Sequence, residues 1–395
     1  MRKISWVIFS LVIILVLSAC EQVSIQDGEE KREPIIFHHY FSGTLSGGID
    51  EMVARYNDSQ TVYRLNAVPI DHEAYKVNIL NSLENGRPAD LNSYWAGEKT
   101  RSIVSYLEPI DDVFKAYDLE NVFPKTLLDS ASLYDGKYYL IPLTQHYVTF
   151  YYNKDVFDKY NLSPPKTWEE FISVCETLKK GGVTPIGLGA KDKWPAQFWF
   201  DYLLLRTAGF EYRTQLMSDQ RHYTEPEVLR AVKLWKDLID AGYFNSNATD
   251  SDWAEDIIEP LMEGEYGMTL MGTWFSGALS QSNSEGNYDV FSFPVIDKKT
   301  PLVALGPVDG IVIGKDAINI EGAKEAIVQF AEVDNQIEMA LGSGAFVPNK
   351  NTPETIYDDY HLRMLEDIKA SKHWAFNYDL ATSPDTAEKG LDFFH

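Results

Sequence analysis

The sequence predicts an α/β protein whose chain is long enough for two domains. Short runs rich in β-branched and aromatic residues alternate with amphipathic stretches, which favours parallel strands covered by helices. The chain has 395 residues, of which 45% are hydrophobic and 13% aromatic, so a large core can be buried. The alternation starts near residue 34 and starts again near residue 147.

The first unit is expected to contain three strands and an early helix. Residues 35–38, 63–68 and 90–95 are predicted strands. Between the first two, a glycine-rich loop leads to a helix whose apolar face begins at Ile49. Ligands of parallel sheets bind at the carboxyl ends of strands, so the segments after the first and third strands are the expected binding positions.

The second unit begins with the dense run YVTFYY at 147–152, a predicted strand. Thr167 and Glu170 have the spacing of a capping box and predict a helix that starts at residue 168. Thr224 and Glu227 have the same spacing and predict a second helix. Further strands are expected at 185–189, 267–271, 290–294 and 310–313, and a further helix at 322–332.

The N-terminus resembles the signal peptide of a bacterial lipoprotein. Two basic residues precede an apolar run at 4–17, which is shorter than the roughly 20 residues of a spanning helix. The letters LSAC at 17–20 resemble a lipobox, which implies cleavage before Cys20 and fatty acylation of that cysteine. An uncleaved N-terminal anchor is the alternative. Residues 21–33 are polar and charged, and are predicted to be a flexible tether.

Composition excludes several functions. The formal net charge of −24 disfavours binding to nucleic acid or to anionic lipid. The only other cysteine, Cys175, has helical apolar spacing from Phe171 and Leu178, which predicts a core position. One remaining thiol permits no disulfide, and the scattered histidines do not suggest a metal site. We therefore expect no metal, no cofactor and no nucleic-acid partner.

Five segments together carry a resemblance to a known family. They are NGRPADLNSYWAG at 85–97, DGKYYLIPLTQHYVTFYYNKDV at 135–156, PKTWEEF at 165–171, GEYGMTLMGTW at 264–274 and ALGSGAFVPNK at 340–350. In this order and at these spacings they resemble the extracellular solute-binding proteins of sugar ABC importers, the group that includes maltose-binding proteins. The resemblance extends from about residue 34 to the end of the chain.

This resemblance implies a periplasmic-binding-protein fold, with two α/β lobes, a hinge and a ligand cleft between the lobes. The first lobe would comprise 34–143 plus 297–345, and the second 146–295 plus 346–395. The chain would cross the hinge near 142–145, 294–298 and 344–346, and solute would favour the closed form. Relatives commonly continue with a final helix, which leaves open that the second lobe lacks its last helix. We expect a monomer.

A sugar offers C–H faces that pack on aromatic rings and hydroxyls that need planar polar partners. The candidate contacts are therefore aromatic or planar polar residues, placed after strands or at the hinge. They are His39, Phe41, Trp95, Glu98, Gln145, Tyr147, Trp194, Trp274 and Asp309.

The resemblance supports these candidates unequally. In relatives, tryptophans matching Trp95 and Trp274 contact sugar, and Glu98 corresponds to a nearby acid. In relatives, residues directly after the first strand make polar contacts with the sugar, which makes Tyr40 a further candidate. Gln145 and Tyr147 could equally be structural, and Asp309 could be a turn former. Phe346 and Trp374 are weaker candidates, and Trp199 is expected in the core.

The leading hypothesis is a lipid-anchored, extracytoplasmic substrate-binding protein of an ABC importer, which captures a sugar or oligosaccharide and delivers it to a membrane permease. One alternative is a binder of polyamine or metal chelate with the same fold. The other is an extracytoplasmic enzyme that acts on glycans. Adjacent carboxylates such as Asp111 and Asp112 point apart on a helix and form no glycosidase pair. No P-loop, HExxH or GxSxG motif is present, so we expect no enzymatic activity.

Overall fold

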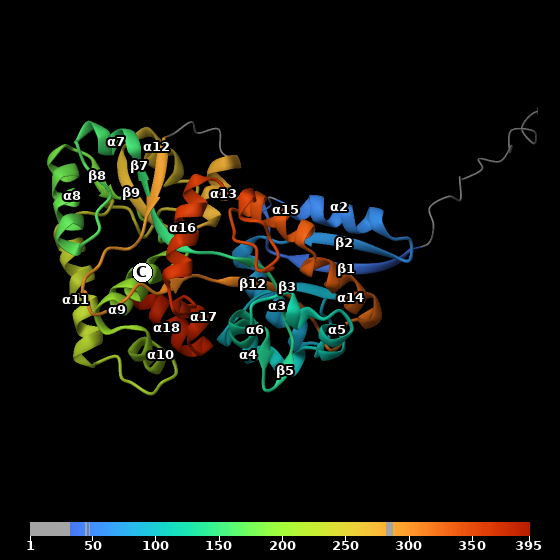
Figure 1. Cartoon of the computed structure of the whole chain (residues 1–395). Coiled ribbons are helices and arrows are strands. Elements are labelled where there is room, and N and C mark those ends of the chain that lie inside the picture. The colour runs from blue at the N-terminus through green and yellow to red at the C-terminus, as the bar shows by residue number, and fades with distance from the viewer. Residues whose placement is uncertain (1–31, 44–45, 47, 282–286) are drawn as a thin grey trace, which may run out of the picture.

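The computed structural model describes residues 32–43, 46, 48–281 and 287–395, so the predicted signal peptide and Cys20 lie outside the described residues. The chain forms two lobes, each built on one sheet with helices packed against it (Figure 1). This is the two-lobed α/β architecture expected from the sequence. No helix in the described part is long and apolar enough to cross a membrane.

The first lobe contains a five-stranded sheet in the order β2-β1-β3-β12-β6. Its strands are β1 (Glu33–His39), β2 (Tyr63–Pro69), β3 (Leu91–Trp95), β6 (Ile141–Gln145) and β12 (Val308–Ile313). Its helices are α2 (Ile49–Ser59), α3 (His72–Glu84), α4 (Glu98–Ile103), α5 (Asp111–Ala116), α6 (Lys125–Ala131), α14 (Ile320–Ile327) and α15 (Val333–Ser343). A small hairpin joins β4 (Leu133–Tyr134) to β5 (Lys137–Tyr138).

The second lobe contains a four-stranded sheet in the order β10-β7-β9-β8. Its strands are β7 (Val148–Asn153), β8 (Thr184–Ile186), β9 (Tyr266–Gly272) and β10 (Tyr288–Phe291). Its helices are α7 (Lys154–Lys159), α8 (Trp168–Lys180), α9 (Gln197–Ala208), α10 (Phe210–Met217), α11 (Pro226–Asp240), α12 (Ile258–Glu263), α13 (Trp274–Gln281), α16 (Asp359–Ala370), α17 (Tyr378–Ala381) and α18 (Pro384–Phe394). A short ladder joins β11 (Ala304–Leu305) to β13 (Trp374–Ala375).

Both sheets are mixed rather than wholly parallel as the alternation predicted. β1 pairs in parallel with β2 and β3, but β12 runs antiparallel to β3 and β6. In the second sheet, β7 runs antiparallel to β9 and β10. β7 and β12 are the strands that enter a sheet directly after the chain crosses between the lobes, so no covering helix fixes their direction.

Each lobe has its own hydrophobic core. One cluster of buried residues draws on 35–143 and 308–339 with Leu380, and the other on 147–305 and 346–394. Cys175 is fully buried in the second cluster, as predicted. Val303, Ala304 and Leu305 also belong to the second cluster, although the sequence placed 297–345 in the first lobe. The cause is β11, which pairs with β13 and keeps the chain on the second lobe until about residue 306.

The three crossings between the lobes lie side by side. Gln145 and Phe346 exchange backbone hydrogen bonds of 3.0 and 2.8 Å, which join the first and third crossings. The His146 N–H donates to the carbonyl of Pro307 at 3.0 Å, which joins the first crossing to the second. The crossings therefore form one hydrogen-bonded hinge.

The two predicted capping boxes have different outcomes. Thr167 and Glu170 form a capping box at the start of α8, as predicted. At α11 the prediction from Thr224 was wrong, because the cap residue is Glu225. Pro226, whose ring fixes φ, occupies the first helical position and sets the start one residue later. The expected helix at 322–332 starts at Ile320 and ends as a 3₁₀ turn at Val328–Ala331.

A buried ion pair holds the C-terminal segment on the second lobe. The Arg213 guanidinium donates to Oδ1 of Asp201 at 2.5 and 3.0 Å, and both side chains are almost completely buried. Arg213 also donates to the Phe376 carbonyl at 2.7 Å, and Oδ2 of Asp201 accepts from the Tyr378 N–H at 2.9 Å. One ion pair thus fixes the segment that carries α17.

Replacing Arg213 by Ala should destabilise the second lobe strongly. The change leaves the Asp201 carboxylate buried without its cation and should lower the free energy of unfolding by about 3–5 kcal/mol. Thermal and urea unfolding measure this effect. Lys125→Ala, which removes an exposed pair with Asp129, is the control and should have little effect. Equal effects of the two variants would contradict the assignment.

Candidate functional site

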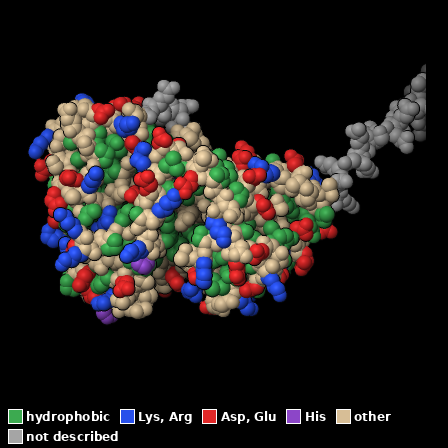
Figure 2. All heavy atoms as spheres, in the orientation of Figure 1, with side chains coloured by type: hydrophobic (Ala, Val, Ile, Leu, Met, Phe, Trp, Pro, Cys, Tyr) green, Lys and Arg blue, Asp and Glu red, His purple; other side chains and the backbone are tan. Residues whose placement is uncertain are grey.

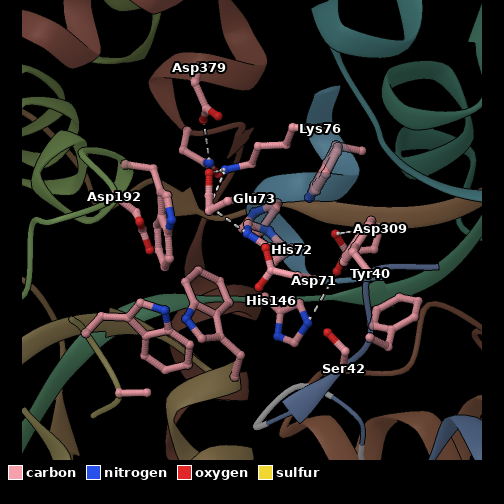
Figure 3. Close-up of a pocket in the computed structure, with 18 of the residues that line it drawn as sticks. Tyr40, Ser42, Asp71, His72, Glu73, Lys76, His146, Asp192, Asp309 and Asp379 are labelled. Carbon is pink, nitrogen blue, oxygen red and sulfur yellow. Dashed lines mark hydrogen bonds and ion pairs between the residues drawn. The ribbon is translucent and has the colours of Figure 1, made fainter. Parts of the chain in front are cut away.

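A cavity of about 450 Å³ lies between the two lobes (Figure 3). It lies within the usual volume range of small-molecule sites. On the molecular face shown in Figure 2, acidic and basic side chains are interspersed over both lobes. Four tryptophans and seven carboxylates line the cavity itself.

Strand ends of the first lobe supply one wall. Tyr40 and Phe41 follow β1, residues 71–73 follow β2, and Trp95 ends β3. β1, β2 and β3 are parallel, so their carboxyl ends meet at one edge, where α/β sheets bind ligands. Asp309, near the start of the antiparallel β12, reaches the same edge.

Loops and helix starts of the second lobe supply the opposite wall. The segment 192–198 leads into α9, the segment 252–255 precedes α12, and Trp274 begins α13 directly after β9. Asn377 and Asp379, at the start of α17, complete this wall. Gly272, at the end of β9, lies beneath the Trp274 ring, because a Cβ there would approach ring atoms to 2.0 Å.

Aromatic rings line both walls. Trp95 stacks on Tyr40 with centroids 4.3 Å apart and an angle of 7° between the planes. On the opposite wall, Trp194 contacts Trp274 edge to face, with ring centroids 5.7 Å apart. The indole N–H groups of Trp194 and Trp274 are buried and have no hydrogen-bond partner among the described residues. An unpaired buried donor is costly, so a ligand acceptor that reaches either group would be stabilised.

Asp309 links the strand ends to the hinge. It is 4% exposed and accepts hydrogen bonds from Tyr40 at 2.6 Å and from Thr144 at 2.7 Å. His146 Nε2 lies 3.4 Å from the same carboxylate, and its Nδ1 lies 2.8 Å from Thr273 in the second lobe. Burial acts to raise the pKa of Asp309, but His146 and the two hydroxyl donors outweigh it and hold the pKa below its usual range.

A second polar group lies at the start of α3. Both oxygens of Glu73 accept from Lys76 at 2.8 and 3.0 Å, and His72 Nδ1 lies 2.8 Å from one of them. Although burial opposes ionisation, these partners lower the pKa of Glu73 to about 2. The carboxylate is therefore ionised at physiological pH and already paired.

One ion pair joins the lobes beside the cavity. Lys99 Nζ of α4 lies 3.6 Å from Asp379 of α17 and 5.2 Å from the centre of the Trp95 ring. Gly97 makes this approach possible, because its φ is +90° and a Cβ there would lie 2.3 Å from the Leu380 carbonyl oxygen. Burial lowers the pKa of Lys99, and Asp379 opposes this shift.

The structure brings five of the nine predicted residues together at the cavity. These are Phe41, Trp95, Trp194, Trp274 and Asp309. Asp309 does not act only as a turn former, because its carboxylate is the acceptor that joins β1, β6 and the hinge. Trp199 is fully buried in the second core, as expected.

Four predicted residues do not line the cavity. His39 lies on the buried face of β1, where its ring centroid is 5.0 Å from that of Phe37. Burial lowers the pKa of His39 to about 4. Glu98 is turned toward solvent and pairs with Arg101 at 3.0 Å. Gln145 serves the hinge through its backbone, and Tyr147 is fully buried in the second core. The weaker candidates Phe346 and Trp374 also lie outside the lining.

Several lining residues were missed from the sequence. Asp71, His72 and Glu73 follow the predicted second strand, so the rule applied to the first and third strands could have found them. Tyr40 was only a further candidate, whereas His39 was predicted to contact the ligand. Side chains alternate between the two faces of a strand, so the two neighbours could have been distinguished. Asp192, Asp252 and Asp379 lie in loops and at a helix start, for which no motif gives a signal. No group of three or more metal-ligating side chains occurs among the described residues.

Two α/β lobes, a triple-crossed hinge and an aromatic cavity between the lobes define a two-lobed solute-binding protein. The family model for bacterial extracellular solute-binding proteins matches residues 42–336. The chain belongs to this family.

Individual relatives agree with this assignment. An ABC transporter extracellular-binding protein of Pyrococcus horikoshii is 26% identical over 92% of this chain and 83% of its own length. The melibiose/raffinose/stachyose-binding protein of Bacillus subtilis is 22% identical over 60% of this chain and 57% of its own. The solved solute receptor AcbH, described as preferring β-D-galactopyranose, has a TM-score of 0.84 and 25% identity, with 91% and 92% of the two chains covered. A chitin oligosaccharide binding protein superposes with a TM-score of 0.81 at 22% identity, covering 92% and 97%.

Asp309 should make stability depend on pH. Its folded-state pKa is depressed, so its stabilisation is present above the ordinary value of about 4 and is lost as pH falls further. Asp309→Asn should lower the unfolding temperature at neutral pH and flatten its decrease on acidification. Thermal unfolding across a pH series measures both effects. Asp129→Asn, at an exposed position, should keep the original profile, and an unchanged profile for Asp309→Asn would contradict the role assigned to the carboxylate.

Proposed function

We propose that this protein is the lipid-anchored substrate-binding protein of an ABC importer. It captures a sugar or oligosaccharide by closing its two lobes and delivers the solute to permease subunits in the membrane. The proposal assigns no catalytic role and no cofactor to the chain, and its working form is a monomer.

The observation that carries the proposal is the chemistry of the cavity. Trp95, Trp194 and Trp274 offer aromatic surface on both lobes, next to carboxylates and the Asn377 amide. Pyranose C–H faces pack on such rings, and hydroxyls can satisfy carboxylate acceptors and the unpaired indole donors. Metal chelates fit this lining less well, since neither a cluster of cationic groups nor one of metal-ligating groups is found there among the described residues.

Lobe closure is supported by groups that lie on both sides of the cavity. His72 of the first lobe contacts Trp194 of the second at 6.2 Å between ring centroids. The Lys99–Asp379 pair and the His146 contacts also connect the lobes. A solute held by both walls binds the closed arrangement better than the open one, and this difference in affinity drives closure.

The lipid anchor rests on the lipobox resemblance at residues 17–20, which lie outside the described residues. Membership of an extracellular family is consistent with export. Acyl chains at Cys20 and the polar segment that follows it would keep the protein close to the permease.

Sugar binding should raise the unfolding temperature. A ligand that binds only the folded state adds about 2.7 kcal/mol at a concentration 100 times its Kd. A thermal-shift screen should cover galactose, xylo-, gluco-, chito- and raffinose-type oligosaccharides, spermidine and a ferric chelate. A sugar should give the largest shift, and its calorimetric Kd should be micromolar or tighter. A shift only with spermidine or the chelate would reject the sugar proposal.

Trp274→Ala should abolish that stabilisation, because it removes an aromatic wall of the cavity. Trp168→Ala is the matched control, since this indole stacks on Phe171 outside the cavity lining and its loss should leave the shift intact. Circular dichroism establishes that both variants fold. An undiminished affinity of Trp274→Ala would remove this residue from the site.

Cys20→Ser should release the protein from membranes. Without the thiol no acyl chain can be attached, so the protein should move from the membrane fraction to the soluble extracytoplasmic fraction. Metabolic labelling with a fatty-acid analogue measures the attachment directly. Cys175→Ser, in the buried core, is the control for labelling and should still be labelled if it folds. Labelling of Cys20→Ser would refute the assigned lipid site.

A further inference from the structure

The cavity has more acidic groups than its own cations can neutralise. Seven carboxylates line it, but Lys76 and Lys99 are the only lysines and no arginine lines it within the described residues. A neutral solute would leave this excess of negative charge in place when closure removes water. Charges buried without a counter-ion are costly, so the composition of the lining constrains the solute.

Most of these carboxylates already have partners. Asp309 accepts two hydroxyl donors beside His146, and Glu73 binds Lys76 and His72. Asp379 pairs with Lys99 and accepts from the Asn377 amide at 3.0 Å. Asp71 accepts the Ala74 N–H at 3.0 Å, and Asp252 accepts those of residues 254 and 255 at 2.7 and 2.9 Å. These five groups have structural partners, and Glu255 is exposed.

Asp192 differs from this group. Its carboxylate accepts no hydrogen bond from any described residue, and no dashed line reaches it in Figure 3. The residue is only partly exposed and lies in the segment that carries the Trp194 ring, with the Trp194 N–H donating to its carbonyl at 2.7 Å. Burial and the negative charges of Glu73 and Asp252 raise the pKa of Asp192, and the positive charges of Lys76 and Lys191 do not cancel this shift, so a further cation beside the carboxylate would be favourable.

Trp274 supplies an independent sign of a missing ligand. It is 8% exposed, lines the same cavity and contacts Trp194, yet its indole N–H has no partner among the described residues. This donor needs an acceptor such as a hydroxyl, whereas Asp192 needs a donor, and a cationic donor also cancels its charge. A solute that satisfies both groups carries a hydroxyl and an ammonium group on the same sugar ring, or on adjacent rings, next to an indole face.

We infer that the solute carries a protonated amine that pairs with Asp192, beside a ring stacked on Trp194. The class of solute is an amino sugar or an oligosaccharide that contains one, and this inference rests on the proposed sugar-binding function. An ammonium group next to the carboxylate neutralises the charge that a hydroxyl would leave, and it can also contact an indole face. A polyamine is the other source of the same ammonium chemistry.

The test compares sugars that differ only in the substituent at C2 of each ring. Glucosamine is paired with glucose, galactosamine with galactose, and the β-1,4 glucosamine dimer with cellobiose and with the N-acetylglucosamine dimer; spermidine is the polyamine arm. Affinities are measured by calorimetry at about pH 6, where amines are protonated and carboxylates ionised. At least one amine should bind roughly tenfold more tightly than its neutral counterpart, in line with a charge-assisted hydrogen bond.

Asp192→Asn should remove that preference, so that an amine and its neutral counterpart bind with similar affinities. The replacement keeps the size of the side chain and breaks no hydrogen bond of the described chain, so folding should be unaffected. Asp250→Asn is the matched control, because it removes one negative charge from an exposed position of the same lobe outside the cavity lining. It should leave the preference unchanged.

The possible outcomes separate the two proposals. Neutral sugars that bind as well as their amines would overturn the inference and leave the sugar-binding function intact, as would an amine preference that survives Asp192→Asn. Binding of spermidine alone, lost in Asp192→Asn, would support ammonium recognition by Asp192 but reject the sugar. Binding of no sugar and no amine would overturn both.

Discussion

The buried carboxylate of Asp309 is the constraint on which the geometry of the site depends. It joins the end of β1 through Tyr40, the end of β6 through Thr144 and the crossing segment through His146. Tyr40 supports the Trp95 ring, so the same hydrogen bonds that tie the strand ends also position the aromatic wall. His146 also contacts the hydroxyl of Thr273, the residue directly before Trp274. The second wall is therefore positioned relative to the same carboxylate.

The position of this network explains how one hinge can serve two lobes with separate cores. Each lobe is stabilised by its own buried cluster, and the lobes meet through polar contacts, the three crossings and a few local apolar contacts such as that of Leu380 with the first cluster. Polar contacts of this kind can be exchanged for water or solute at small net cost, whereas a continuous apolar core could not. The lobes can therefore move as bodies without unfolding.

Much of the fold was predictable from the sequence, because its signals are local. The capping box of α8 and the strand runs at the start of each lobe follow from propensity and periodicity. Trp95 and Trp274 were found because they follow strands and match a family pattern. His39 was misjudged because the two-residue alternation of β1 directs it inward. The role of Asp379 could not be foreseen, because the Arg213–Asp201 pair positions α17 through hydrogen bonds to Phe376 and Tyr378, which lie more than 160 positions away in the sequence.

The walls of the cavity draw on residues from Tyr40 to Leu380, nearly the whole length of the folded chain. Tyr40 and Asp309, which bond directly, are separated by 269 positions. A chain whose last segment has not yet docked therefore has no complete binding cavity. Contacts between such distant residues form late in folding. Solute capture in this protein is thus coupled to the folding of the whole chain, and a partly folded chain cannot compete for solute with finished molecules.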